Sequence, residues 1–131
     1  MLISHTGQSY EGNFQNGLPE GLGKLISPAG DVYEGEFSKG KKHGNGKITM
    51  IGGKTYEGQW EDSLPNGLIR EIDPDGDFYE GQYKDGKRHG QGKLIVKSLK
   101  TYEGTFLDNV PHGQGKLTIP GVAVYEGIFT S

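Results

Sequence analysis

The tripeptide Tyr-Glu-Gly occurs six times in this chain, and each copy begins 23 residues after the previous one. A constant period of this length, without insertions, is typical of repeat proteins, in which each repeat is one supersecondary unit that packs against its neighbours. We therefore expect one array over residues 1–131. It would consist of a half repeat at 1–9, a half repeat at 125–131, and five full repeats that begin at Tyr10, Tyr33, Tyr56, Tyr79 and Tyr102.

The order of residue types within a repeat predicts two β-strands. If the Tyr of each repeat is called position 0, position 4 is always aromatic, position 11 is always Gly and position 14 is always Lys or Arg. Positions 0, 2 and 4 share a face only in a strand, and each recurrent Gly would cost a helix about 1 kcal/mol. We place strands at positions −1 to 4 and 11 to 17, separated by turns such as 84–89 and 74–77. Each repeat is then a β-hairpin.

The chemistry of facing positions predicts the register of these hairpins. If position 0 faces position 15, then position 2 faces position 13, position 4 faces position 11, and position 1 faces position 14 on the reverse side. The aromatic rings then cover backbone at glycine, and each Glu meets a basic residue in an exposed pair that contributes about 0.2–1 kcal/mol. The predicted fold class is all-β: a single-layer, twisted antiparallel sheet of consecutive 23-residue hairpins.

Composition argues against several other classes of protein. The chain has no Cys, so neither disulfides nor thiolate metal ligands are available. Its net charge of −3 disfavours nucleic acid as a partner. No apolar run approaches the roughly 18 to 20 residues of a membrane-spanning helix, and the first ten residues lack the charged and apolar segments of a secretory signal. We expect a cytoplasmic protein, with association with the cytoskeleton or a membrane as a further alternative.

Two motifs that resemble chemical sites are explained better by the repeat. Three repeats carry a histidine at the same position, namely His43, His89 and His112. Equivalent positions in adjacent hairpins lie about 10 Å apart, whereas zinc ligands lie about 2 Å from the metal. The segments 35–41 and 81–87 read Gly-x-x-x-x-Gly-Lys, but Lys42 and Arg88 follow where a phosphate loop needs Ser or Thr. We expect no catalytic residue, no metal, no cofactor and no enzyme activity.

The complete pattern resembles the MORN repeat (membrane occupation and recognition nexus). It combines Tyr-Glu-Gly-x-aromatic with Gly-Lys-x-His-Gly-x-Gly, as at 40–46 and 86–92, and the resemblance covers essentially the whole chain. It implies a non-enzymatic scaffold, similar to the arrays of junctophilins, of cytoskeletal proteins in protists and of myosin-tail partners. It also implies three modes of association: phospholipid binding, peptide binding in an aromatic groove, and antiparallel dimerisation.

Our main functional hypothesis is a protein-binding module that takes a peptide or a helix in an aromatic groove. The same rings would also form the hydrophobic face of the sheet, so we expect only part of the row to remain open. The candidate residues are Tyr33, Phe37, Tyr56, Trp60, Tyr79, Tyr83, Tyr102 and Phe106.

The alternative hypothesis is a phospholipid-binding membrane tether, and a third is a targeting region of a larger protein. Two of the five loops are basic, and each basic side chain near an anionic membrane contributes about 1 kcal/mol. The acidic total charge opposes this alternative. The candidate residues are Lys39, Lys41, Lys42, Lys84, Lys87 and Arg88.

The third repeat departs most from the common pattern. It has Ser63 in place of the loop Gly, Asn66 in place of His, Ile69 in place of Gly and Glu71 in place of an aliphatic residue. We expect its packing of aromatic rings on glycine to be altered, with a changed pocket near Trp60. In later repeats, Leu99 and Val122 replace a turn Gly, so those turns should differ in type.

The ends of the array predict self-association. Leu2 and Ile3 fall at positions 15 and 16 of a missing repeat, and 125–129 is an outgoing strand without a partner. Either the chain is a segment of a longer array, or these unprotected edges pair between chains, in a closed dimer or head to tail in an open filament. The resemblance to MORN arrays favours a dimer. We expect a homodimer that forms through a terminal repeat.

Overall fold

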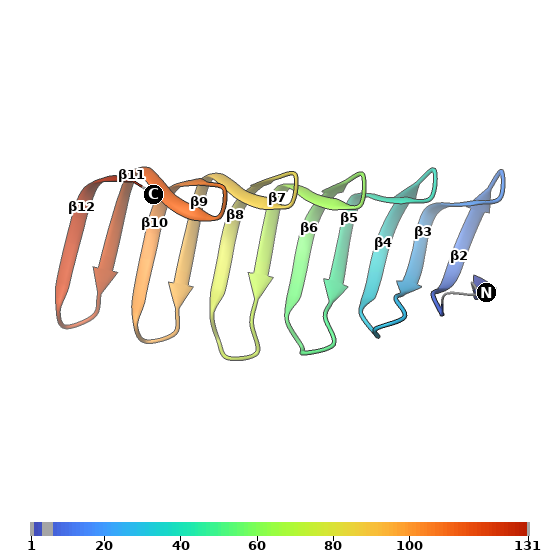
Figure 1. Cartoon of the computed structure of the whole chain (residues 1–131), viewed down its shortest axis with the longest axis horizontal. Helices are drawn as coiled ribbons and strands as arrows, with labels where there is room; N and C mark the ends of the chain where they lie inside the picture. Colours follow the sequence, from blue (N-terminus) through green and yellow to red (C-terminus); the bar gives the residue numbers. More distant parts are fainter. Residues whose placement is uncertain (1, 4–6, 131) are drawn as a thin grey trace.

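The computed structural model describes residues 2–3 and 7–130, which form one 12-stranded antiparallel sheet with its strands in sequence order (Figure 1). The strands are β1 (Leu2–Ile3), β2 (Ser9–Gln15), β3 (Leu18–Ile26), β4 (Val32–Ser38), β5 (Lys41–Thr49), β6 (Thr55–Glu61), β7 (Leu64–Ile72), β8 (Phe78–Lys84), β9 (Lys87–Val96), β10 (Lys100–Leu107), β11 (Val110–Ile119) and β12 (Ala123–Phe129). The expected all-β, single-sheet architecture is confirmed. No helix long and apolar enough to cross a membrane occurs among the described residues.

The hairpin turns are shorter than the sequence predicts. The turn expected over residues 84–89 occupies only Asp85 and Gly86, because β8 continues to Lys84 and β9 begins at Lys87. Both turn residues have positive φ, 50° and 85°. This combination defines a type I′ turn, whose twist matches that of the flanking strands. The other four hairpins turn in the same way. The tight turns therefore lie side by side at one end of the strands, which we call the tight-turn edge, and the connecting turns lie at the opposite end (Figure 1).

The register agrees with the prediction up to a bulge in each hairpin. In the second repeat Tyr33 faces Ile48 and Gly35 faces Gly46, as expected. The prediction that position 4 faces position 11 within a hairpin is wrong, because Phe37 faces Lys42. Two extra residues of β5 lie in the bulge between these pairs, and position 11 instead faces position 4 of the next repeat.

The Tyr at position 0 stabilises this bulge. The Tyr33 hydroxyl donates a hydrogen bond to the backbone carbonyl of Glu36 at 2.9 Å. Its ring lies against Gly46 so closely that a Cβ atom there would overlap the phenol. The predicted packing of rings on glycine is therefore confirmed, and the same hydrogen bond recurs in other repeats. The equivalent donors are Tyr10, Tyr79, Tyr102 and Tyr125.

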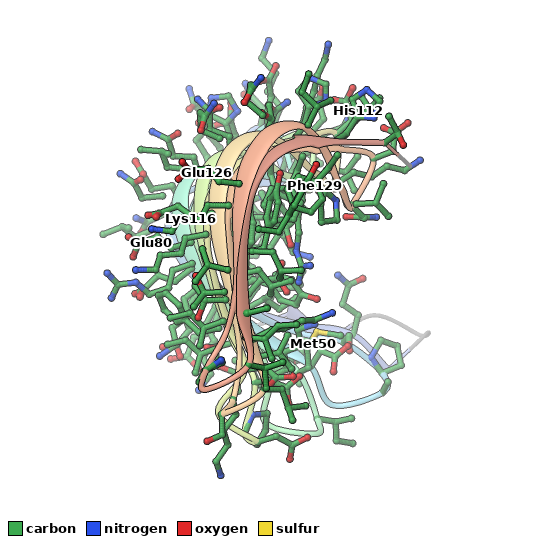
Figure 2. The ribbon with its side chains drawn as sticks, turned by 90° about the vertical axis from the view of Figure 1, so that its left-hand side faces the viewer. Met50, Glu80, His112, Lys116, Glu126 and Phe129 are labelled. Atoms are coloured by element: carbon green, nitrogen blue, oxygen red, sulfur yellow. The ribbon has the colours of Figure 1, made fainter. Side chains whose placement is uncertain are left out.

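The strands bend along their length, so the sheet has a convex and a concave face (Figure 2). Glu80, Lys116 and Glu126 point away from the convex face, whereas Met50 and Phe129 point into the concave side. On the convex face acidic and basic residues alternate across neighbouring strands, as the sequence predicts. Arg70 and Glu80 form an ion pair of 2.9 Å in this row.

The concave face carries the hydrophobic core as a row of aromatic rings in edge-to-face contact. Centroids in the row lie about 5 Å apart, as between Tyr33 and Phe37 at 5.1 Å. Such contacts add about 0.5–1.5 kcal/mol per pair beyond burial. The row divides into two clusters, one around Tyr10, Tyr33, Phe37 and Trp60, the other around Ile69, Tyr79, Tyr83, Tyr102 and Phe106.

The last two connecting turns differ from the first three, as the sequence predicts. Gly76 has φ of 98° in the third connecting turn. Where Leu99 and Val122 replace that Gly, the positive φ moves one residue earlier, to Ser98 at 59° and Gly121 at 74°. The loops shorten accordingly, so β9 and β10 pair directly up to Val96 and Lys100.

Candidate functional site

The aromatic row is interrupted at Tyr56, in the repeat with the most departures. Ile69 faces Gly58 where other repeats pair two glycines. The Ile69 side chain is buried, 2% exposed, and fills the space over which a position 0 ring otherwise lies. Tyr56 is consequently half-buried, whereas Tyr33 and Tyr79 are each only 1% exposed. The Tyr56 side chain packs against both core clusters and lines the concave side between them.

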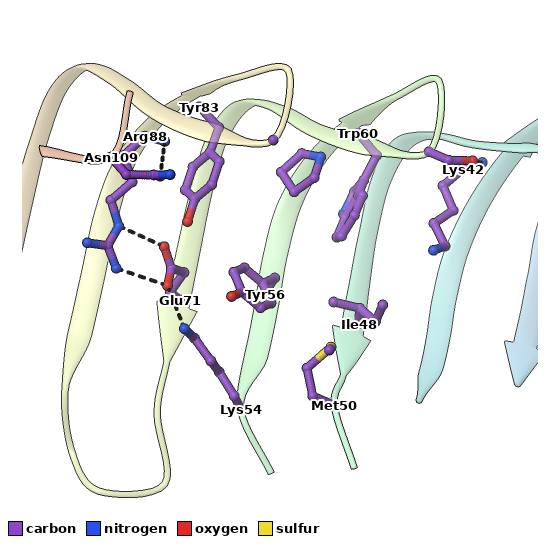
Figure 3. A pocket seen from close by; sticks show the side chains of 13 residues that line it. Lys42, Ile48, Met50, Lys54, Tyr56, Trp60, Glu71, Tyr83, Arg88 and Asn109 are labelled. Carbon is purple, nitrogen blue, oxygen red and sulfur yellow. Dashed lines mark hydrogen bonds and ion pairs between the residues drawn. The ribbon is translucent and has the colours of Figure 1, made fainter. Parts of the chain in front are cut away.

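Glu71 is the buried charged residue of this region, at 3% exposed. Arg88 binds it with two parallel hydrogen bonds, from Nε at 3.0 Å and from a terminal guanidinium nitrogen at 3.1 Å. The Lys54 ammonium lies 3.2 Å from the same carboxylate (Figure 3). A carboxylate removed from water requires such charged partners. The Arg88 guanidinium also lies 4.7 Å from the centre of the Tyr79 ring.

Lys54 connects Glu71 with the displaced ring. Its ammonium lies 5.0 Å from the centre of the Tyr56 ring, within the range of a cation–π contact. Burial lowers the pKa of the Lys54 ammonium, but the Tyr56 hydroxyl and the Glu71 carboxylate together raise that pKa above its ordinary value. Lys54 therefore remains charged and holds a fixed position beside the ring.

Lys42 reaches the concave face from the other side of Trp60. Its ammonium lies 5.5 Å from the Tyr33 ring centre and 5.8 Å from that of Trp60. Burial lowers the pKa of this ammonium, against a smaller opposing effect of Asp31. Within the part of the chain that the structure describes, Lys42 forms no ion pair.

These side chains surround a cavity of about 480 Å³, which we call the central pocket (Figure 3). This volume lies within the range of small-ligand and side-chain pockets. The aromatic lining residues are Tyr56, Trp60 and Tyr83; the other apolar ones are Ile48, Met50 and Pro65; the charged ones are Lys42, Lys54, Glu71 and Arg88. Three cations and one carboxylate give the pocket a positive excess in a chain of net charge −3.

Two hairpin tips fix the basic residues of the central pocket. The Ser63 hydroxyl accepts the backbone N–H of Lys42 at 3.2 Å, and the Ser63 N–H donates to the Lys42 carbonyl at 3.1 Å. In the same way, the Asn109 side-chain amide oxygen accepts a hydrogen bond from the backbone N–H of Arg88 at 3.0 Å. Each tip is thus bound to the strand of the preceding hairpin, which makes the rim of the pocket rigid.

Of the eight groove candidates, seven are mainly core residues. Their exposed fractions range from 1% to 7%: Tyr33, Phe37, Trp60, Tyr79, Tyr83, Tyr102 and Phe106. Tyr56 is the exception, and the central pocket brings it together with Trp60 and Tyr83. Among these eight candidates, the structure therefore leaves accessible aromatic surface mainly at Tyr56. Outside this set, Phe14 and Tyr125, toward the two ends of the row, are 42% and 49% exposed.

The six candidate lipid-binding residues do not form one surface. Lys39, Lys41, Lys84 and Lys87 are exposed at the tight turns. Lys42 and Arg88 are half-buried and point onto the concave face, because successive residues of a strand face opposite sides. This separates the two inward cations from the other four.

Sequence reasoning missed Lys54 and Glu71 as site residues. The signal for Glu71 was present, since an acidic residue at an inward aliphatic position requires a cation nearby. Lys54 precedes its strand by one residue and gives no comparable signal. As for metals, no group of three or more potential ligands occurs among residues 2–3 and 7–130.

Comparison with known families supports the resemblance. The family model described as the MORN repeat matches five segments: 10–32, 33–54, 56–78, 79–95 and 102–121. The chain belongs to the MORN repeat family. MORN repeats are generally protein- or lipid-binding modules and are not typically enzymes. No curated protein matched this MORN array in full-sequence comparison.

Proposed function

We propose that this MORN array is a protein-binding scaffold module whose partner contacts the central pocket. The half-buried ring of Tyr56, beside Trp60 and Tyr83, is the observation that carries the proposal. Aromatic side chains in a partly enclosed pocket are the usual anchors of protein interfaces. The remaining candidate rings are at most 4% exposed and offer a partner little surface: Tyr33, Phe37, Tyr79, Tyr102 and Phe106. Phe14 and Tyr125 are exposed, but they lie toward the two ends of the row and do not line the central pocket.

The rigidity of the central pocket also supports protein binding. Ser63 and Asn109 fix the backbone of Lys42 and Arg88, and Glu71 fixes the side chains of Arg88 and Lys54. A preformed site loses little conformational entropy when a partner binds, so more of the contact energy appears as affinity. A scaffold of this kind is compatible with a cytoplasmic or cytoskeletal location.

The alternative function is binding of anionic phospholipids through the tight-turn edge. The exposed residues Lys39, Lys41, Lys84 and Lys87 favour it. The same edge carries acidic residues in its tight turns, at Asp62, Asp85 and Asp108. Lys41 already lies 3.9 Å from Asp62. Mixed charge reduces attraction to an anionic surface, so we favour protein binding.

The experiment that tests this function compares proteins captured by the intact chain with those captured by pocket variants. Tyr56→Ala removes the half-buried ring, and I69G/E71L restores the common pattern, in which the Tyr56 ring should lie against glycine and close the pocket. Lys93→Ala, on the exposed convex face, is the matched control. Captured proteins are identified by mass spectrometry, and circular dichroism confirms that each variant folds.

We expect both pocket variants to lose the same partners and Lys93→Ala to retain them. Retention of all partners by both pocket variants would contradict the proposal. In parallel, the chain is sedimented with vesicles containing phosphatidylserine at about 0.15 M salt. Binding to vesicles that requires the four exposed lysines, together with unchanged protein capture by the pocket variants, would support the lipid alternative instead.

A further inference from the structure

The three basic side chains of the central pocket differ in whether they form an ion pair. Lys54 and Arg88 both bind Glu71, at 3.2 and 3.0 Å. Lys42 is half-buried, faces Trp60 and forms no ion pair with any described residue. Its neighbour Lys41 is exposed to solvent and lies near Asp62. Lys42 is therefore the cation of the pocket that is available to a ligand.

The positions of the strands define how far this cation lies from the aromatic anchors. Lys42 is on β5, Trp60 on β6 and Tyr83 on β8 (Figure 3). Pro65 is on β7, between Trp60 and Tyr83 in strand order. Neighbouring strands lie about 4.8 Å apart, so β7 is about 10 Å from β5. An extended chain crosses this distance in about three residues.

We propose that the partner of the central pocket is an acidic peptide segment that presents a carboxylate to Lys42 and an apolar side chain over Pro65, between Trp60 and Tyr83. The carboxylate and the apolar residue should be two to four positions apart in an extended segment. This inference rests on the proposed function, and adds the chemistry of the partner. Charge complementarity carries it, because the pocket has a positive excess and one unpaired cation.

Other ligands fit the same charges less well. A basic segment would place like charge beside Lys42, and no free carboxylate is left to receive it because Glu71 already binds two cations. A phosphate dianion is best held by several donors, whereas Lys54 and Arg88 are engaged. A bilayer is flat on this scale and meets the exposed lysines of the tight turns, whereas Lys42 is half-buried on the concave face.

Glu71 has a positioning role in this scheme. By binding Arg88 and Lys54 it limits the pocket to one available cation, and hence to a segment with one well-placed carboxylate. Glu71→Gln would release part of that restraint and leave the two cations without a charged partner. We expect this variant to select segments that carry additional acidic residues.

The test is selection of a displayed library of random 12-residue peptides on the intact chain. We expect selected peptides to contain Asp or Glu two to four residues from an aromatic or aliphatic residue. A selected peptide is then synthesised and its affinity measured by fluorescence polarisation. Lys42→Gln should weaken binding about tenfold, since hydrogen bonds to charged groups contribute that much, whereas Lys41→Gln should change it less than about twofold.

Two further variants keep the result interpretable. Lys42→Arg preserves the charge and should bind within about threefold of the intact chain, which gives a reading if Lys42→Gln folds poorly. A peptide whose acidic residue is replaced by its amide should lose its dependence on Lys42. Selection of neutral or basic peptides, or equal effects of Lys41→Gln and Lys42→Gln, would overturn the inference.

The outcomes also separate this inference from the proposed function. Neutral peptides whose binding is lost in Tyr56→Ala would refute the acidic partner but leave the protein-binding pocket intact. Peptides that bind Tyr56→Ala and I69G/E71L as tightly as they bind the intact chain would refute both the acidic partner and the protein-binding pocket. Binding to phosphatidylserine vesicles that falls in Lys42→Gln but not in Lys41→Gln would assign Lys42 to a membrane and overturn the inference.

Discussion

Replacing Tyr33 and Tyr56 separately by Phe tests how the repeat is stabilised. The Tyr33 hydroxyl donates to the Glu36 carbonyl at 2.9 Å, and its ring is 1% exposed. Tyr33→Phe removes one hydrogen bond and leaves that carbonyl of the bulge without its donor. A hydrogen bond of this kind contributes about 1 kcal/mol, and an unsatisfied buried acceptor costs about 1–3 kcal/mol. Since Glu36 itself is exposed and water can reach it, we expect a loss of about 1–1.5 kcal/mol.

Tyr56→Phe is the matched variant, because the same hydroxyl there has been displaced toward Lys54 at a half-buried position. We expect the free energy of unfolding to fall by less than about 0.5 kcal/mol. Urea denaturation, followed by circular dichroism and by the fluorescence of the single Trp, measures both. A third variant, Tyr102→Phe, repeats the Tyr33 test at a hydrogen bond of 2.8 Å. Equal losses at Tyr33 and Tyr56 would refute the assignment of the hydroxyl to the bulge.

Three other predictions concern packing, pH and assembly. Gly46→Ala should destabilise the chain by about 2 kcal/mol or more, because its Cβ would overlap the Tyr33 ring, whereas Gly52→Ala, with open space around it, should be nearly neutral in the same melts. Burial raises the pKa of Tyr33 and of Tyr79 to about 12 from 10.0, so the contribution of these two phenols to stability should be fully present below pH 10 and be lost between pH 10 and 12, as phenols ionise in the unfolded but not the folded state. Unchanged urea midpoints between pH 10 and 12 would contradict this. A homodimer through the open edge of β12 should appear in light scattering at about 100 µM and disappear when 124–131 are deleted, and a strictly monomeric intact chain would disprove it.

Much of the fold follows from the sequence because the same pairs of residues face each other across adjacent strands in most repeats. Gly at positions 2 and 13 leaves room for a ring, and Glu at position 1 needs the base at position 14, so these pairs determine the register on one side of the bulge. The bulge was not predictable from these pairs. The bulge is stabilised by a hydrogen bond from a side chain to the backbone, as from Tyr33 to Glu36. A tyrosine at a core position does not reveal in the sequence that its hydroxyl also binds the backbone.

The candidate site was predictable only in part, since a repeat pattern describes what the units share and the site is made by what they do not. Ile69 and Glu71 indicated a change near Trp60, and the central pocket lies there. The partner cations were harder to identify. Whether Lys42 faces inward depends on the length of the tight turn, because one residue more or less places it on the opposite face.

The interruption at Tyr56 has a consequence for cooperativity. The stability of a repeat array is approximately the sum of the stabilities of its repeats and of the interfaces between neighbouring repeats. The weakest interface determines where one part of the array can unfold while the other stays folded. Edge-to-face contacts connect Tyr33 with Trp60 and, separately, Tyr79 with Phe106, but no described ring pair crosses Tyr56. The strand ladder and the packing of Tyr56 against both clusters connect the two ends of the array here, and we expect this coupling to be the weakest in the array. A ligand bound in the central pocket would contact residues of both clusters and strengthen this coupling, and the whole array should then melt as one unit.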